Sequence, residues 1–375
     1  MINRLDRVVL QGTALTALIA VLGMTFLFTA LGLYQIVNNF QVTPRFSTLI
    51  SFAPTLWISL LPFSLPVSVL FAASMVMGRM RAENELLLLA ASGVAPWRPF
   101  VALAPLGIVT AALSGFAVSD LGPSAYLERD NLQRKALADF IDHPPQGPRE
   151  LRFADSGVDF SYSRFEGGHF EDLSLMHYGR LAPEQEEGLL ALLTARRARI
   201  VYMRQSRILL LTGCVQVRLV RFDPGTGAPV EGTLVAERMN ELRVPFEFGA
   251  TVQRNPPKSM PTQELLRRAG EELARPGRRG ACGEIVRRAG LTGAGLWLPL
   301  LGALLAALVS HPNRLLAIGA GVVPSALVYY PAVMACQNLA EAGTLHPLAA
   351  SLAPALIACA CIAILMGVHW RRGWA

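Results

Sequence analysis

The sequence predicts an α-helical membrane protein with six transmembrane helices and an all-β domain inserted between the third and the fourth. Apolar residues make up 52% of the chain and charged residues only 16%. The mean hydropathy of +0.39 is high for a soluble protein of this length. Six intervals lack Asp, Glu, Lys and Arg, and each offers the roughly 20 residues with which a helix crosses a bilayer. They are 8–44, 46–78, 99–119, 289–313, 315–340 and 342–370.

The stretch between the third and fourth intervals has the charge density of a soluble domain, and its hydrophobic period is that of strands. Apolar and polar residues alternate over 160–163, 173–175, 215–219 and 242–246, with turn signals at 166–168, 211–213 and 223–225. Many short strands with one apolar face predict a sandwich or an open barrel. We therefore divide the chain into helices one to three (1–120), the β domain with its linkers (121–283) and helices four to six (284–375).

Basic residues beside the short loops predict the orientation. With the N-terminus in the cytoplasm, the short loops on the far side hold only Arg45. Both termini are then cytoplasmic and the β domain is external. The net charge of +7 follows from this topology, so it gives little support to nucleic-acid binding. The cytoplasmic flanks would hold Arg4, Arg7, Arg79, Arg81, Arg98, Arg314, Arg371 and Arg372.

A short charged helix, at about 81–93, is predicted between the second and third spans. Glu83 and Glu85 stand in its first turn, where carboxylates suit the helix dipole, and Gly93 stands where a C-cap glycine would end it. A helix this short is marginal alone in water, so we expect it to lie against the membrane helices or a partner. The alternative is an ordinary solvated turn.

The second span contains Pro54, Pro62 and Pro66. Proline frees backbone carbonyls and permits a bend, provided that neighbouring helices cover the exposed groups. The segment 61–66 is therefore a candidate kink.

Polar residues at the outer ends of the first and fifth spans are candidates for contact with a lipid headgroup. They can equally cap the spans at the membrane surface. The candidates are Gln35, Asn38, Asn39, Arg45, Gln337 and Asn338.

No catalytic constellation is visible, so the chain is expected to be neither an enzyme nor the holder of a metal or cofactor. It has no Gly-x-x-x-x-Gly-Lys-Ser/Thr phosphate loop and no Ser/His/Asp order. His143, His169 and His177 lack the spacing of zinc ligands, and the five cysteines form no disulfide framework. Any energy for transport must come from another protein.

Several segments, in this order and spacing, resemble the LptF/LptG family, the permeases of the lipopolysaccharide-export ABC transporter. They are Leu-Pro at 61–62 with Pro66, Ala-Glu-Asn-Glu-Leu at 82–86 with Ala-Ser-Gly at 91–93, 194–199, 209–213, Met-Pro-Thr-Gln-Glu-Leu at 260–265, and 312–337. The resemblance covers nearly the whole chain, with three helices, a strand-rich external domain and three helices.

The resemblance implies a multi-pass subunit of the bacterial inner membrane that pairs with a sister permease and is driven by an LptB-like ATPase dimer. The helix at 81–93 would be a coupling helix in a groove of the ATPase. Glu83 and Glu85 match its charged positions, with Glu85 favoured for an ion pair, while Leu86 and Leu89 would pack in the groove.

By the same resemblance, lipopolysaccharide or a related glycolipid enters between helices one and five and passes over a periplasmic β-jellyroll to LptC/LptA-like bridge proteins. Candidates for the apolar jellyroll lining can also be read as the packed core of any sandwich. They are Phe160, Tyr162, Leu173, Leu175, Val201 and Leu210.

One departure from the family concerns the outer end of helix one, where amides replace the basic residues that contact lipid phosphates. Two other functions stay open. A subunit that acts mechanically on periplasmic partners, without moving lipid, would keep the same coupling helix. A secondary transporter would need ionisable residues near the membrane midplane, and the charge-free intervals argue against it.

Overall fold

The computed structural model describes residues 4–40, 46–95, 97–129, 131–132, 144, 147–153, 158–179, 188–203, 208–222, 230, 234–245, 256–274, 277, 279–309 and 314–372. The chain divides into two compact units. The helical unit comprises Met1–Ala30, Pro54–Leu127 and Pro257–Ala375, and the sheet unit comprises Leu31–Ala53 and Glu128–Pro256. The helical unit thus resumes at Pro257, whereas we placed the sequence boundary after residue 283.

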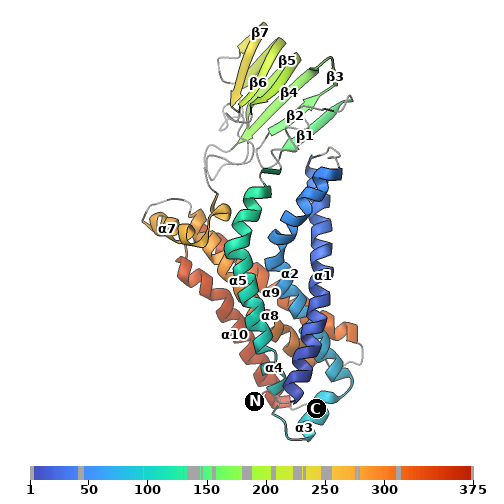
Figure 1. Ribbon diagram of the computed structural model, residues 1–375. Helices are drawn as coiled ribbons and strands as arrows, with labels where there is room; N and C mark the ends of the chain where they lie inside the picture. Colours follow the sequence, from blue (N-terminus) through green and yellow to red (C-terminus); the bar gives the residue numbers. More distant parts are fainter. Residues whose placement is uncertain are drawn as a thin grey trace. The chain divides into compact units, whose positions relative to one another are not determined.

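Six long apolar helical segments and an antiparallel sheet between the third and the fourth confirm the predicted fold class (Figure 1). The candidate spans are Asp6–Gln35, Ile50–Ala82, Arg98–Arg129, Gly280–Leu308, Leu315–Glu341 and Pro347–Arg371. The helices are α1 (Arg4–Phe40), α2 (Phe46–Ala82), α3 (Glu85–Ala91), α4 (Arg98–Val101), α5 (Ala104–Phe116), the π-helical turn η1 (Ala117–Leu121), the 3-10 turn η2 (Pro257–Ser259), α7 (Thr262–Leu273), α8 (Gly280–Leu308), α9 (Arg314–Glu341) and α10 (Pro347–Arg372).

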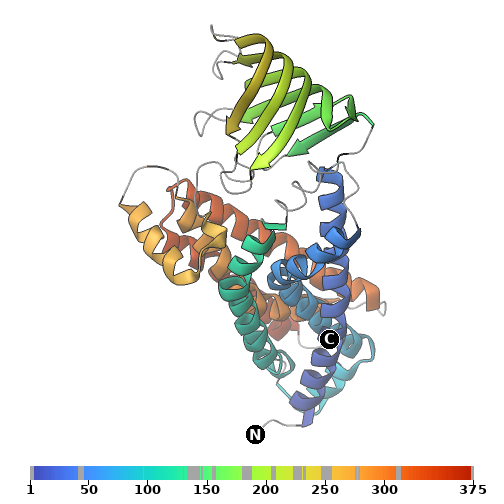
Figure 2. The same cartoon turned by 45° about the horizontal axis from the view of Figure 1, so that its top comes forward.

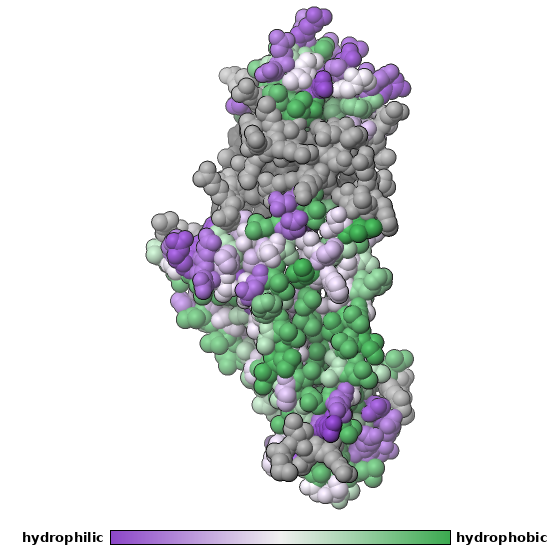
Figure 3. Space-filling view, in the orientation of Figure 1, coloured by the Kyte–Doolittle hydropathy of each residue, from purple (hydrophilic) through white to green (hydrophobic). Residues whose placement is uncertain are grey.

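The helices α5 and α8 touch through glycine. A Cβ atom on Gly295 would lie 2.6 Å from the backbone nitrogen of Ala111, and one on Gly107 would lie 3.3 Å from the carbonyl oxygen of Leu296. Small residues allow membrane helices to approach this closely. The N-terminal and C-terminal helix trios therefore share one packed interior. Figure 3 shows the apolar surface of the helical unit between two ends where hydrophilic side chains gather.

The kink segment of α2 stays helical because another helix supplies a donor. Pro66 has no N–H, so the carbonyl of Pro62 has no partner within α2. The hydroxyl of Ser114, on α5, is fully buried and lies 3.3 Å from this carbonyl oxygen. It also lies 3.2 Å from the carbonyl oxygen of Leu291 on α8. One serine therefore connects three helices at the level of the prolines.

The sheet unit is built from one antiparallel sheet of seven strands, which Figure 2 shows side by side. Its order is β1-β2-β4-β5-β6-β7, and β3 pairs with β4. Strands that follow one another in the chain are therefore neighbours in the sheet, except β2 and β3, which both pair with β4. The strands are β1 (Arg149–Phe153), β2 (Val158–Tyr162), β3 (Arg164–Glu166), β4 (His169–Gly179), β5 (Gly188–Met203), β6 (Ile208–Arg221) and β7 (Leu234–Pro245).

One face of the sheet holds a continuous apolar cluster. Aromatic rings lie at its β2–β4 end, with Phe170 edge-on to Phe160 at 5.6 Å and to Tyr162 at 5.1 Å between ring centroids. Such edge-to-face pairs add to the stabilisation that burial gives. The cluster continues across β5 and β6 through Leu193 and Leu211.

Two of the predicted turns have different outcomes. The one at 166–168 is confirmed, because Gly167 and Gly168 take positive φ angles of 58° and 78° between β3 and β4. The one at 211–213 is wrong, because these residues lie inside β6. There the pairing with β5 slips between Arg197 and Arg199, and Gly213, at φ 62°, accommodates the irregularity. The third, at 223–225, falls outside the described residues.

We expect Ser114→Ala to lower the free energy of unfolding of the chain by about 1 kcal/mol, because the buried Pro62 carbonyl would lose the only donor within reach of it that the described residues provide. Unfolding of the purified protein in detergent measures it. Ser124→Ala is the matched control, since that exposed hydroxyl bonds only to its own helix, at Leu121. Equal stability of the two variants would contradict the role of Ser114.

We expect the Cys214 thiol to resist alkylation until the sheet unfolds. The side chain is 1% exposed, and burial raises the pKa of its thiol, so less of the reactive thiolate exists at neutral pH. In a chain whose only cysteine is Cys214, maleimide labelling should be at least about tenfold slower than in one whose only cysteine comes from Ser163→Cys, an exposed position. Similar rates would show that this face opens easily.

Candidate functional site

A residue with a left-handed backbone conformation stands at each end of the short helix α3. Asn84 precedes it with a left-handed φ of 59°, a conformation that asparagine tolerates better than most residues. At the other end Gly93 has φ 79°, its N–H donates to Ala90, and the N–H of Val94 donates to Leu89. These two bonds form a Schellman motif, so the predicted C-cap glycine is confirmed.

One side of α3 is buried in the helical unit. Leu86 is 0% exposed and packs in a cluster with Val9 of α1, Met77 and Met80 of α2, and Phe100 of α4. Leu89 packs against the same cluster and is half-buried. Leu86 is thus packed inside the chain, and its predicted packing in a partner's groove stays a prediction.

The opposite side of α3 carries the exposed apolar residues. Leu87 is 46% exposed and Leu88 is 67% exposed. Glu83, in the turn before the helix, is also exposed. An exposed leucine pair beside a carboxylate is a surface suited to another protein. The sequence did not reveal which leucines are available, because four follow one another at 86–89 and all faces of so short a run look apolar.

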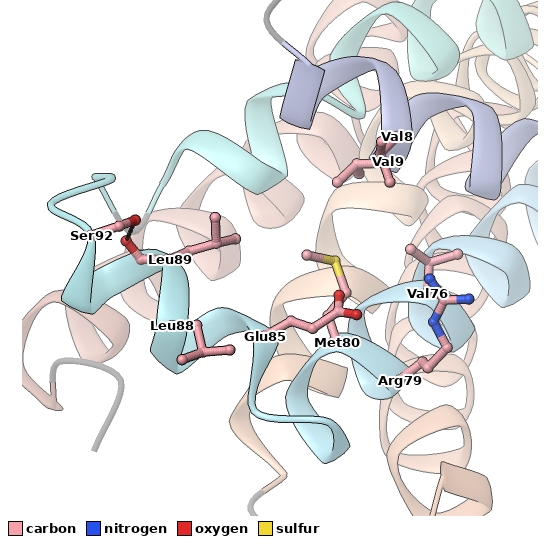
Figure 4. Close-up of a pocket in the computed structure, with 9 residues that line it drawn as sticks. All are labelled: Val8, Val9, Val76, Arg79, Met80, Glu85, Leu88, Leu89 and Ser92. Carbon is pink, nitrogen blue, oxygen red and sulfur yellow. Dashed lines mark hydrogen bonds between the residues drawn. The ribbon is translucent and has the colours of Figure 1, made fainter.

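Glu85 lies between the two sides, at a pocket of about 400 Å³. Figure 4 shows its side chain directed from α3 into the space next to the end of α2. Arg79 lines the same pocket, so the site offers both charges on an otherwise apolar wall. The lining residues are Val8, Val9, Val76, Arg79, Met80, Glu85, Leu88, Leu89 and Ser92.

The candidate headgroup residues are only partly described. Gln35 is exposed near the end of α1, Asn38 and Asn39 lie on α1 without described side chains, and Arg45 lies outside the described residues. The Gln337 amide donates to Glu341 at 2.9 Å, so one of its groups is already engaged. Asn338 is exposed. A role in lipid contact stays a prediction for all of these residues.

The six candidate lining residues fall on both faces of the sheet. Phe160, Tyr162, Leu173 and Leu175 belong to the buried cluster. Val201 and Leu210 are paired across β5 and β6 on the other face, where Val201 is 40% exposed. The register shift between β5 and β6, a β-bulge, causes this placement. Before the bulge the odd-numbered residues Leu193 and Ala195 of β5 are buried, and after it the even-numbered Ala198 and Ile200 are buried.

A buried ionic network, which the sequence analysis missed, fastens α7 to α8. Arg288 is 6% exposed, and its guanidinium donates to Glu284, to the Thr262 hydroxyl and to the Met260 carbonyl at 3.0, 3.0 and 2.8 Å. Thr262 thus serves as an acceptor for Arg288, and Pro261 holds the N-cap position of α7. The sequence could have indicated this network through the i, i+4 spacing of Glu284 and Arg288, which stand beside an apolar run.

A second contact fixes the start of α8 to α7. A carboxylate oxygen of Glu272, on α7, accepts the backbone N–H groups of Ala281 and Cys282 at 2.8 and 3.4 Å. These N–H groups have no partner within α8, so the acidic side chain acts as a cap supplied by another helix.

A comparison with protein families identifies the family that has this combination of six spans, a short helix α3 and an inserted sheet. The model of the lipopolysaccharide export system permease LptF/LptG matches residues 7–367. The chain belongs to the LptF/LptG family. Members of this family are inner-membrane permease subunits and not enzymes themselves. No curated protein matches the chain.

We expect Arg288→Met to lower the free energy of unfolding of this LptF/LptG protein by about 1–3 kcal/mol, because the bonds from Arg288 to the Thr262 hydroxyl and the Met260 carbonyl are lost. Glu284 keeps its ion pair with Arg287. Thermal unfolding in detergent measures the loss of stability. Arg267→Met on the exposed side of α7 is the control, and an equal loss there would contradict the network's role.

Proposed function

We propose that the chain is the transmembrane permease subunit of an ABC transporter that extracts lipopolysaccharide, or a related glycolipid, from the inner membrane. A separate LptB-like ATPase dimer supplies the energy, a sister permease completes the membrane part, and LptC/LptA-like proteins receive the lipid. The match to the permease family over residues 7–367 carries this proposal.

The coupling step in this proposal uses the exposed side of α3. Leu87 and Leu88 enter the ATPase groove, and Glu85 forms an ion pair with an ATPase arginine at the rim. Exposure of both leucines supports this assignment, which differs from the pair Leu86 and Leu89 that the sequence resemblance implies. Burial of Leu86 supports the mechanical role, because a rigidly packed side chain passes a displacement of α3 to its neighbours.

The displacement reaches four other helices directly. The cluster around Leu86 contains Val9 of α1, Met77 of α2, Phe100 of α4 and Leu304 of α8. A movement of α3 caused by ATP binding or hydrolysis therefore acts on both helix trios at once. This arrangement suits a permease that opens a path for lipid between its helices.

The proposed orientation places α3 and both chain termini in the cytoplasm. Asp6 near the start of α1 and Arg98 at the start of α4 lie 3.9 Å apart, so these segments share one end of the helical unit. The sheet unit is then periplasmic, and its apolar face, from Phe160 to Leu175, shields acyl chains on their way to the bridge.

The function is tested in proteoliposomes that contain the chain, its sister permease, the ATPase and a lipopolysaccharide-type glycolipid. We expect transfer of this lipid to a soluble periplasmic acceptor with ATP and none with ADP. ATP hydrolysis without any transfer, despite a correctly assembled complex, would contradict lipid export and favour a purely mechanical subunit.

In the same system Glu85→Ala and Leu88→Glu should each reduce ATPase association or ATP-driven transfer at least about tenfold, because both alter the docking surface. Neither should destabilise the chain. Leu86→Ala provides the contrast, since a fully buried leucine costs about 2–5 kcal/mol of stability when truncated. Normal association and transfer in Glu85→Ala and Leu88→Glu would remove α3 as the ATPase contact.

A further inference from the structure

A second pocket lies at the same end of the helical unit as α3, and it belongs to no step of the proposed transport cycle. Its volume is about 420 Å³. It is formed by Trp97, which precedes α4, and by the last turns of α10, which ends the sixth span. The residues from α10 are Met366, Gly367, His369, Trp370 and Arg371.

The floor of this pocket is fixed by contacts to two other helices. His369 is 5% exposed, and its Nε2 atom lies 3.0 Å from the Leu304 carbonyl oxygen on α8. Its ring also packs on Phe100 of α4, with 5.5 Å between ring centroids. The end of α10 is thereby held against α4 and α8, so the pocket is formed before any ligand arrives.

The rim of the pocket combines two exposed tryptophans with a cation. Trp97 is 46% exposed and Trp370 is 77% exposed, and Arg371 is exposed as well. Tryptophan concentrates at the level of lipid headgroups, where its ring is partly apolar and its N–H can bond to polar groups. Arginine at the end of a span attracts anionic lipids.

The charge at this end of the helical unit agrees with an anionic ligand. Among the described residues there, the basic side chains outnumber the acidic ones Asp6, Glu83 and Glu85. The basic residues are Arg7, Arg79, Arg81, Arg98 and Arg371. A ligand with a negative head and an apolar body would meet both the arginine and the apolar wall.

We propose that this pocket binds one anionic phospholipid from the leaflet on the α3 side of the membrane. Arg371 binds the phosphate, and the upper acyl chains lie between Trp97, Met366 and Trp370. In the proposed orientation this leaflet is the cytoplasmic one. The site is thus separate from the path of the exported lipid, and its test does not depend on the identity of the cargo.

The bound lipid would lie against the segment that joins α3 to α4. Only residues 92–96 of the sequence separate the end of α3 from Trp97. Occupancy of the pocket therefore adds an apolar contact on one side of the segment that carries the coupling helix.

The test measures quenching of tryptophan fluorescence by brominated lipids in nanodiscs. The full chain retains only Trp97 and Trp370, with the remaining tryptophans replaced by phenylalanine. The nanodiscs contain phosphatidylcholine with a small fraction of either dibromo-phosphatidylglycerol or dibromo-phosphatidylcholine. We expect about fivefold stronger apparent binding of the brominated phosphatidylglycerol, the preference that one arginine near the membrane surface provides.

Two variants distinguish a site from general lipid contact. Gly367→Leu should abolish the preference, because this glycine lines the pocket and a side chain there meets open space, so the chain folds normally while the pocket is filled. Gly319→Leu on α9 is the matched control, since it also meets open space, and should keep the preference. Arg371→Gln should remove the preference for the anionic lipid.

Three outcomes would overturn the proposal. The first is an unchanged preference in Gly367→Leu. The second is an equal preference in a chain that retains only Trp57, an exposed residue of α2, because it would show general enrichment of anionic lipid around the protein. The third is protection of Trp97 and Trp370 from both lipids in the complete transporter, which would identify the pocket as a protein contact.

Discussion

Pairing of buried polar groups is the constraint on which the rest of the helical unit depends, because the core of a bilayer offers no water to satisfy them. The contacts between helices are accordingly made by hydroxyl and ring groups that reach carbonyl oxygens of other helices. Ser114 meets Pro62 and Leu291, Tyr329 donates to the Gly290 carbonyl at 2.9 Å, and His369 meets Leu304. These bonds join α5 to α2 and α8, α9 to α8, and α10 to α8.

The same constraint accounts for what the sequence could predict. The six spans were readable because charge is excluded from them over long intervals, and the family was readable because its motifs keep their order over the chain. The position and the C-cap of α3 followed from Glu85 and Gly93, whose effects are local. The orientation of its leucines depends on tertiary packing around Leu86, which no local pattern records.

The sheet shows a second limit of sequence reading. Strand alternation predicts which residues share a face only while the register is regular, and the bulge near Arg197 changes the phase within β5. Val201 and Leu210 therefore lie away from the buried cluster although each alternates correctly with its neighbours. The Arg288 network was missed for a related reason: its acceptors at Met260 and Thr262 are close only after α7 folds back on α8.

The glycine contacts between α5 and α8 have a consequence for how the protein can move. Backbones that touch at Gly107 and Gly295 leave no side chains between them to rearrange, so the two helices can pivot about each other only as stiff rods. The inserted sheet separates these helices in the sequence, yet they touch at this one glycine contact within the helical unit. A small tilt at the α3 end, as the proposed coupling requires, would move the far ends of both helices, where the chain leaves for the sheet and returns from it.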